Sequence, residues 1–217
     1  MSALYTYDET ERHVNNMVEL YEHVRELFED EVAELYNVHR DLAGDIVRMN
    51  LVLHDVGKFT HEYTRVRGFD HSSEYVANKF FDEFKIQPLI NIDKKLFKNI
   101  LGTVHMVIIY HHEIRRKDDE KRMKIEPHFV KEKVIDLFNR HVRYFKLVEG
   151  SVACRISYID PSSVGVLNIV TLLDNIEAIL MRRGSDASLS QLMHEYLQNT
   201  VYSYVFNVAK ELWGCSA

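Results

Sequence analysis

Histidine stands out as the source of chemistry in this sequence, with 12 copies among 217 residues. It is the commonest metal ligand in proteins. Two histidine-containing pairs, His54-Asp55 and His111-His112, each follow an apolar run. The runs predict that both pairs lie at the edge of a core, where an ionised carboxylate needs a partner. A divalent cation would be one such partner. A solvated helix end for the first pair, and chance adjacency for the second, are the alternatives.

An acid in an apolar stripe gives a further candidate. Asp174 has Leu167, Val170 and Ala178 as neighbours on one helical face, which is an unusual place for a carboxylate. Either Asp174 pairs with a cation or that face meets solvent. Asp160 precedes Pro161, and this pattern predicts a helix cap. We therefore take Asp174 as the ligand and Asp160 as the cap.

Other histidines could complete a site. His71 opens a predicted helix, where it would be either a ligand or a residue of the cap. The N-terminal helix offers His13 or His23. These two are ten residues apart and so lie about 80° apart around a helix, which means that they cannot serve one site equally.

The pattern of apolar residues predicts an all-α helical bundle, with residues 1–217 as a single domain. The chain has only 8 Gly and 3 Pro, which favours long helices. Gly57 is expected to end the second helix, and Pro127 to open the fifth. Residues 59–70 are expected to form a loop, and 144–159 have some strand character without predicting a sheet. The expected helices cover 9–36, 41–56, 71–85, 93–113, 127–145, 161–181 and 188–213.

Charge and composition narrow the class of function. The net charge of −6 argues against an electrostatic coat for duplex DNA, but bound cations could still serve a nucleic-acid substrate. Cys154 and Cys215 are far apart and predict two ordinary thiols. We find no apolar run that predicts a membrane span, and the acidic N-terminus is unlike a secretory signal. We therefore expect a cytoplasmic protein.

The ordered set His, His-Asp, His, His-His, Asp resembles the HD superfamily of metal-dependent phosphohydrolases. It is more specifically similar to the stand-alone CRISPR-associated HD nuclease of type I interference systems. The adjacent His-His pair favours this second resemblance. Two features depart from the family pattern. Ser72 stands where the family often has Glu. His13 lies farther before His54 than the first histidine of generic members tends to lie, whereas His23 gives their shorter spacing. The matching stretches are residues 11–16, His54-Asp55-x-Gly57-Lys58, Phe69–Ser72, Tyr110–Glu113 and Leu172–Asn175.

The resemblance implies an HD-domain bundle with one or two ions bridged by Asp55. His13, His54 and Asp174 would complete one ion site, and His71, His111 and His112 the other. So many imidazoles favour Mn, Ni, Co, Fe or Zn over Mg. Lys58 could contact the scissile phosphate, or it could be a helix-end cation. Arg115 and Arg116 could guide a single strand, although segment 114–124 could equally be a solvated loop.

The expected function is metal-dependent cleavage of single-stranded DNA, or of RNA, in type I CRISPR interference. The expected partners are a helicase subunit and an RNA-guided surveillance complex, with no membrane. One alternative is an HD phosphohydrolase that acts on nucleotides or other small phosphate esters. Another is a non-catalytic binding module. A shallow cleft would favour the nuclease, and an enclosed nucleoside pocket the small-molecule enzyme.

Overall fold

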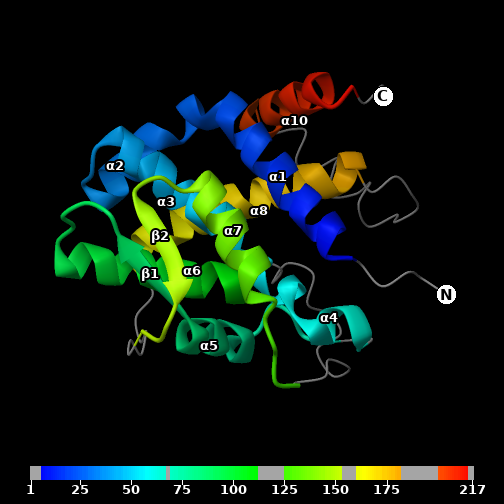
Figure 1. The fold of residues 1–217 in the computed structure, drawn as a ribbon. Coiled ribbons are helices and arrows are strands. Elements are labelled where there is room, and N and C mark those ends of the chain that lie inside the picture. The colour runs from blue at the N-terminus through cyan, green and yellow to red at the C-terminus, as the bar shows by residue number, and fades with distance from the viewer. Residues whose placement is uncertain (1–5, 67–68, 112–124, 153–159, 182–199, 215–217) are drawn as a thin grey trace.

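A computed structural model describes residues 6–66, 69–111, 125–152, 160–181 and 200–214 of the chain. It is mostly helical, which confirms the all-α prediction (Figure 1). Short 3-10 turns cover Arg25–Leu27 and Val56–Phe59. The helices are α1 (Tyr7–Val24), α2 (Glu29–Tyr36), α3 (Arg40–Leu53), α4 (His61–Arg65), α5 (Glu74–Glu83), α6 (Lys94–Tyr110), α7 (Lys131–His141), α8 (Pro161–Met181) and α10 (Thr200–Leu212), and the strands are β1 (Phe84–Pro88) and β2 (Phe145–Glu149).

Helix α8 was predicted best. Its bounds match the expected 161–181, and Asp160 caps it as expected, since the backbone N–H of Ser162 donates to Asp160 Oδ1 at 3.0 Å. The helix expected over 9–36 is wrong as one element, because a 3-10 turn separates α1 from α2. Both halves pack on α3 and α8, but α1 also packs on α10, whereas α2 packs chiefly on α3.

Several predicted boundaries are also wrong. Pro127 does not open α7, because the residues after it pair with the segment around Thr60. There the N–H of His61 donates to the carbonyl of His128, and Thr60 and Phe129 form a β-bridge. The loop expected over 59–70 contains α4, and the helix expected over 71–85 begins only at Glu74. Of the helix expected over 188–213, residues 188–199 lie outside the described residues.

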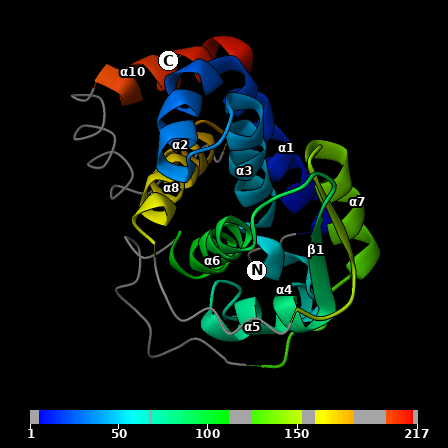
Figure 2. The ribbon, with the colours of Figure 1, turned by 90° about the vertical axis from the view of Figure 1, so that its left-hand side faces the viewer.

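The one sheet within the described ranges is a two-stranded antiparallel pair, with Ile86 opposite Leu147. The strand character of residues 144–159 therefore corresponds to β2, whereas β1 was not predicted. The strands bury Phe84, Ile86, Phe145 and Leu147 and lie against α5 and α7, away from α10 (Figure 2).

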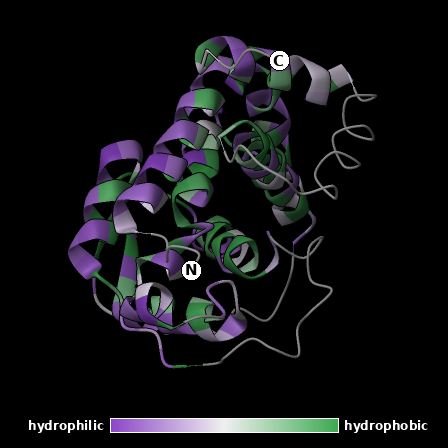
Figure 3. Ribbon diagram, turned by 90° about the vertical axis from the view of Figure 1, so that its right-hand side faces the viewer, coloured by the Kyte–Doolittle hydropathy of each residue, from purple (hydrophilic) through white to green (hydrophobic). Residues whose placement is uncertain are grey.

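Helices α6 and α8 lie, with α3, in the interior of the bundle. Both are largely hydrophobic, whereas the outer helices carry more polar residues (Figure 3). Their buried side chains belong to one continuous hydrophobic core. By length and composition α8 could also cross a membrane, with a mean hydropathy of 1.7, which differs from our reading of the sequence. About half of that stretch (56%) is buried inside the fold, as in the core helix of a bundle.

Candidate metal centre

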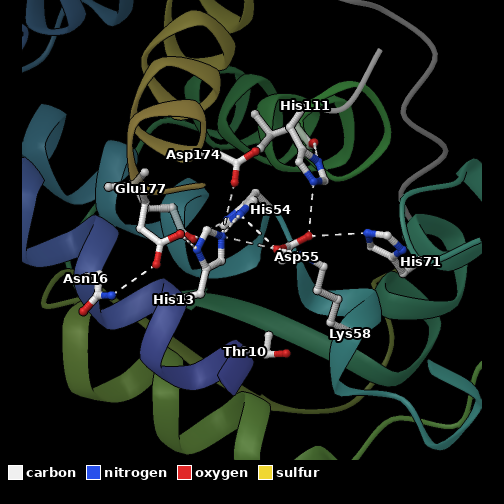
Figure 4. Close-up of polar contacts among 12 residues, drawn as sticks. Thr10, His13, Asn16, His54, Asp55, Lys58, His71, His111, Asp174 and Glu177 are labelled. Atoms are coloured by element: carbon white, nitrogen blue, oxygen red, sulfur yellow. Dashed lines mark hydrogen bonds and ion pairs between the residues drawn. The ribbon is translucent and has the colours of Figure 1, made fainter. Parts of the chain in front are cut away.

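Elements that are distant in sequence meet at the C-terminal end of α3 (Figure 4). Helix α1 contributes His13, α6 contributes His111 at its end, and α8 contributes Asp174. Except for His71 in the loop before α5, which is partly exposed, the assembled residues are buried. The structure thus brings together every predicted metal or catalytic residue that it describes: His13, His54, Asp55, Lys58, His71, His111 and Asp174.

Gly57 explains how the loop with His71 reaches this place. The prediction that Gly57 ends the second helix is wrong, because α3 ends at Leu53 and Gly57 lies within the following 3-10 turn. A Cβ atom at this position would overlap the backbone carbonyl of His71. The glycine therefore permits close approach of the His71 backbone to the turn that carries Asp55.

The two oxygens of Asp55 face different sets of side chains. On one side, Oδ2 lies 3.5 Å from His13 Nε2 and 3.3 Å from His54 Nε2. On the other side, Oδ1 lies 3.3 Å from His111 Nε2 and 3.7 Å from His71 Nε2. Lys58 Nζ donates to Oδ2. Asp55 is therefore placed between two groups of imidazoles.

The outward hydrogen bonds of three histidines orient their rings. His54 Nδ1 donates to the carbonyl of Leu51 at 2.7 Å, and His111 Nδ1 donates to the carbonyl of Val107 at 2.8 Å. His13 Nδ1 lies 2.6 Å from Glu177 Oε2. These contacts place a proton on each Nδ1 and turn each Nε2 inward. This is the usual arrangement of histidines that bind a metal through Nε2.

His13, His54 and Asp55 form a buried group that can hold a metal ion, since one ligand atom from each lies within 4.8 Å of the others. The two Nε2 atoms are 3.3 Å apart, and neutral imidazoles would point lone pairs at each other there. Asp174 Oδ1 adds negative charge 3.3 Å from His13 Nε2. A cation fits this set of two nitrogens and nearby carboxylate oxygens.

Protons compete with a cation at this place. Burial acts to lower the pKa of His13, but hydrogen bonds to Asp174 and Glu177 outweigh it and raise that pKa to about 9. Metal-free protein thus holds a proton on His13 at neutral pH, and metal binding must displace it. Burial, only partly opposed by Asp55, lowers the pKa of His111, which keeps that imidazole neutral.

The structure also separates the paired candidates. His13 lies in the centre, whereas His23 is exposed and contacts the carbonyl of Glu19. Asp174 lies in the centre, and Asp160 is the cap of α8. Ser72, at the position where the family often has Glu, is fully buried. His112, Arg115 and Arg116 lie outside the described residues.

Sequence reasoning missed Glu177 and Asn16. Glu177 follows Asp174 by three positions, so both carboxylates lie on one face of α8. Its Oε2 contacts His13, and its Oε1 accepts a hydrogen bond from Asn16 Nδ2 at 3.1 Å. The available signal was this second acid on the helical face of Asp174.

No protein-family model matches the chain, and a search of curated proteins finds no match. The resemblance to the HD superfamily therefore rests on the ordered sequence motifs alone.

Proposed function

We propose that the chain is a metal-dependent phosphodiester hydrolase of the HD superfamily that cleaves single-stranded nucleic acid. The observation that carries the proposal is the position of Asp55 between two groups of imidazoles. His13 and His54 face Oδ2, and His71 and His111 face Oδ1. A carboxylate with a different set of donors at each oxygen is suited to bridge two cations.

The ligands are divided as follows in this proposal. His13, His54 and Asp174 would hold one ion, and His71 and His111 would hold a second, to which the resemblance adds His112. The preponderance of imidazole over carboxylate favours Mn, Ni, Co, Fe or Zn over Mg. Ions held in this way activate water and neutralise charge on a phosphodiester.

Other groups of the protein orient the imidazoles and contact the phosphate. The backbone carbonyls of Leu51 and Val107 hold two of the imidazoles in fixed orientations. Lys58 donates to Asp55 and also lines the adjoining pocket. Its ammonium group is therefore placed to contact both the bridging carboxylate and a phosphate in the pocket.

Nucleic acid is the favoured substrate because the ordered motifs resemble the CRISPR-associated HD nuclease. We propose that the protein acts in type I interference with a helicase subunit that supplies single-stranded DNA, beside an RNA-guided complex. The direct test is nicking of circular single-stranded DNA by protein loaded with Mn, Ni, Co, Fe, Zn or Mg in turn.

Asp55→Asn is the critical variant, and His23→Gln is a matched control that removes an exposed histidine outside the centre. Metal-dependent nicking that is lost in the first and kept in the second supports the proposal. Turnover of nucleotides without nicking would replace the nuclease by the small-molecule alternative. No binding of metal would overturn both enzymes and favour a binding module.

A further inference from the structure

A pocket of about 400 Å³ opens beside the candidate metal centre. His13, Lys58 and Glu177 belong both to the centre and to the wall of the pocket, and the rest of the described wall comes mainly from α1. The volume lies in the range of small-ligand sites. A group bound there would therefore lie directly next to the atoms that converge on Asp55.

Nearly all the charged groups in this wall are committed to other parts of the protein. Glu9 accepts a hydrogen bond from the N–H of Thr6 at 2.7 Å, as part of the cap of α1. Lys58 donates to Asp55. Glu177 contacts His13 and Asn16. Lys58 is therefore reserved for Asp55 and the scissile phosphate, Glu177 is bound to His13 and Asn16, and Glu9 keeps a negative charge in the wall.

Arg12 is the exception. It is exposed and lines the pocket, and within the described ranges it forms no ion pair. Arg25, Arg40, Arg48 and Arg140 each pair with a carboxylate, and the other described arginines, Arg65 and Arg143, lie outside the pocket. A guanidinium group presents several donors in a plane and matches the oxygens of a phosphate. The guanidinium group of Arg12, unpaired among the described residues, therefore suits an anion bound in the pocket.

The remaining wall argues against a site for a nucleobase. Its described residues include Met181 but no Phe, Tyr or Trp, whereas bases are commonly held by stacking on such rings. We propose that Arg12 binds, in this pocket, the phosphate that neighbours the scissile phosphate of a polynucleotide. This inference rests on the proposed function and adds that the substrate carries at least two consecutive phosphates.

The test compares two substrates that differ in that second phosphate. Single-stranded oligothymidylate has it, and bis(p-nitrophenyl) phosphate is a lone phosphodiester. For Arg12→Ala we expect KM for the oligonucleotide to rise about tenfold more than KM for the small ester, since a charge-assisted hydrogen bond is lost. Arg12→Lys should recover part of the loss. Equal changes on both substrates, or none on the oligonucleotide, would overturn the proposal.

Binding by metal-free protein gives a readout that needs no catalysis. The probe is fluorescein-labelled oligothymidylate, titrated at several salt concentrations. Arg12→Ala should bind more weakly, with a salt dependence shallower by about 0.7 in log–log slope. Arg143→Ala also removes an exposed arginine but lies outside the pocket, so it should bind like the wild type. Equal losses from the two variants would overturn the proposal.

The proposed hydrolase function and the proposed anion site at Arg12 can be tested independently. If the wild type cleaves DNA and Arg12→Ala is unchanged, the pocket assignment is wrong and the hydrolase stands. If the wild type cleaves nothing but its binding of the oligonucleotide depends on Arg12, the anion site stands and the hydrolase is wrong.

Discussion

Two buried charged clusters lie along α3, one in its middle and one just beyond its C-terminal end, and they are built differently. In the middle, Asp45 and Arg48 are both buried, and Asp45 Oδ1 lies 3.2 Å from Arg48 Nη1. Arg48 also contacts Glu22, and Asp45 Oδ2 accepts hydrogen bonds from the N–H groups of Arg143 and Tyr144. Each charge in this first cluster therefore meets an opposite charge or a donor.

Beyond the C-terminal end of α3, most of the groups around Asp55 are potential metal ligands, and Lys58 and the proton on His13 balance the carboxylates there. Imidazole nitrogens and carboxylate oxygens converge there, and Lys58 is the one permanent cation among the described groups. The comparison teaches that burial of charge does not by itself mark a functional centre. The direction of the lone pairs distinguishes a structural cluster from a group that can hold a metal.

Replacing the buried acid of each cluster should give the largest contrast. Asp45 and Asp55 are both fully buried. We expect Asp55→Asn to abolish metal uptake and reduce metal-dependent hydrolysis to background, because the bridging carboxylate is lost. Asp45→Asn should keep both per mole of folded protein. Calorimetric metal titration and nicking assays measure the two properties, and similar behaviour of the two variants would refute the distinction.

Breaking the structural cluster should affect folding instead. Arg48→Met leaves Asp45 buried without its ion pair, and we expect the free energy of unfolding to fall by about 3 kcal/mol. Urea denaturation of the metal-free protein measures this loss. Metal affinity of the folded variant should match the wild type. Loss of affinity without loss of stability would assign a functional role to the cluster of Asp45 and Arg48.

The two histidines of α1 sharpen the comparison within one helix. His13→Gln removes a ligand, so metal affinity should fall by more than the roughly 100-fold limit typical of outer partners of a ligand. His23→Gln should leave the affinity unchanged because His23 is exposed and contacts only its own helix within the described residues. The same titration measures both, and a larger loss for His23→Gln would assign the first ligand to the other histidine.

Glu177 should have a smaller effect on the metal, because it acts through His13. Glu177→Gln removes the charge behind the imidazole and should weaken metal binding by about tenfold. Asn16→Ala should weaken it less, since it removes one contact to Glu177 Oε1. Met181→Ala is the matched control, being one turn further along α8 and on the same pocket. If Glu177→Gln and Met181→Ala bind metal equally, Glu177 has no orienting role.

The smallest expected effect is the acid sensitivity of the structural cluster. Burial acts to raise the pKa of Glu22, but the hydrogen bond from Arg48 and the charges of nearby arginines outweigh it and lower that pKa below 4.5. A depressed pKa in the folded state stabilises the protein above the unfolded value, and this contribution is lost as pH falls through the folded value. Stability of the wild type should therefore decline more steeply in acid than that of Arg48→Met. Parallel denaturation profiles would contradict this assignment.

Local patterns account for what the sequence predicted well. The apolar runs before His54-Asp55 and before His111 placed these residues at the edge of the core, and Asp174 was recognised because it interrupts an apolar stripe. The bounds of α8 followed from Asp160-Pro161, a signal that depends on adjacent residues alone.

The missed features depend on contacts between distant segments. The true reason for Gly57 is the approach of the His71 backbone, and β1 forms against a strand about 60 residues away. Glu177 contacts His13, which lies 164 positions earlier in the chain. Such pairings are set by tertiary packing, so the local periodicity of the sequence does not predict them.

The most direct test of the central claim is anomalous X-ray diffraction from crystals loaded with Mn or Zn. We predict an anomalous peak bounded by His13 Nε2, His54 Nε2 and Asp55, at about 2.0–2.2 Å from the nitrogen ligands. A second peak on the side of Asp55 that faces His71 and His111 would extend the result to two ions. Metal found only elsewhere, with Lys58 still bound to Asp55 and the centre free of anomalous signal, would contradict the account.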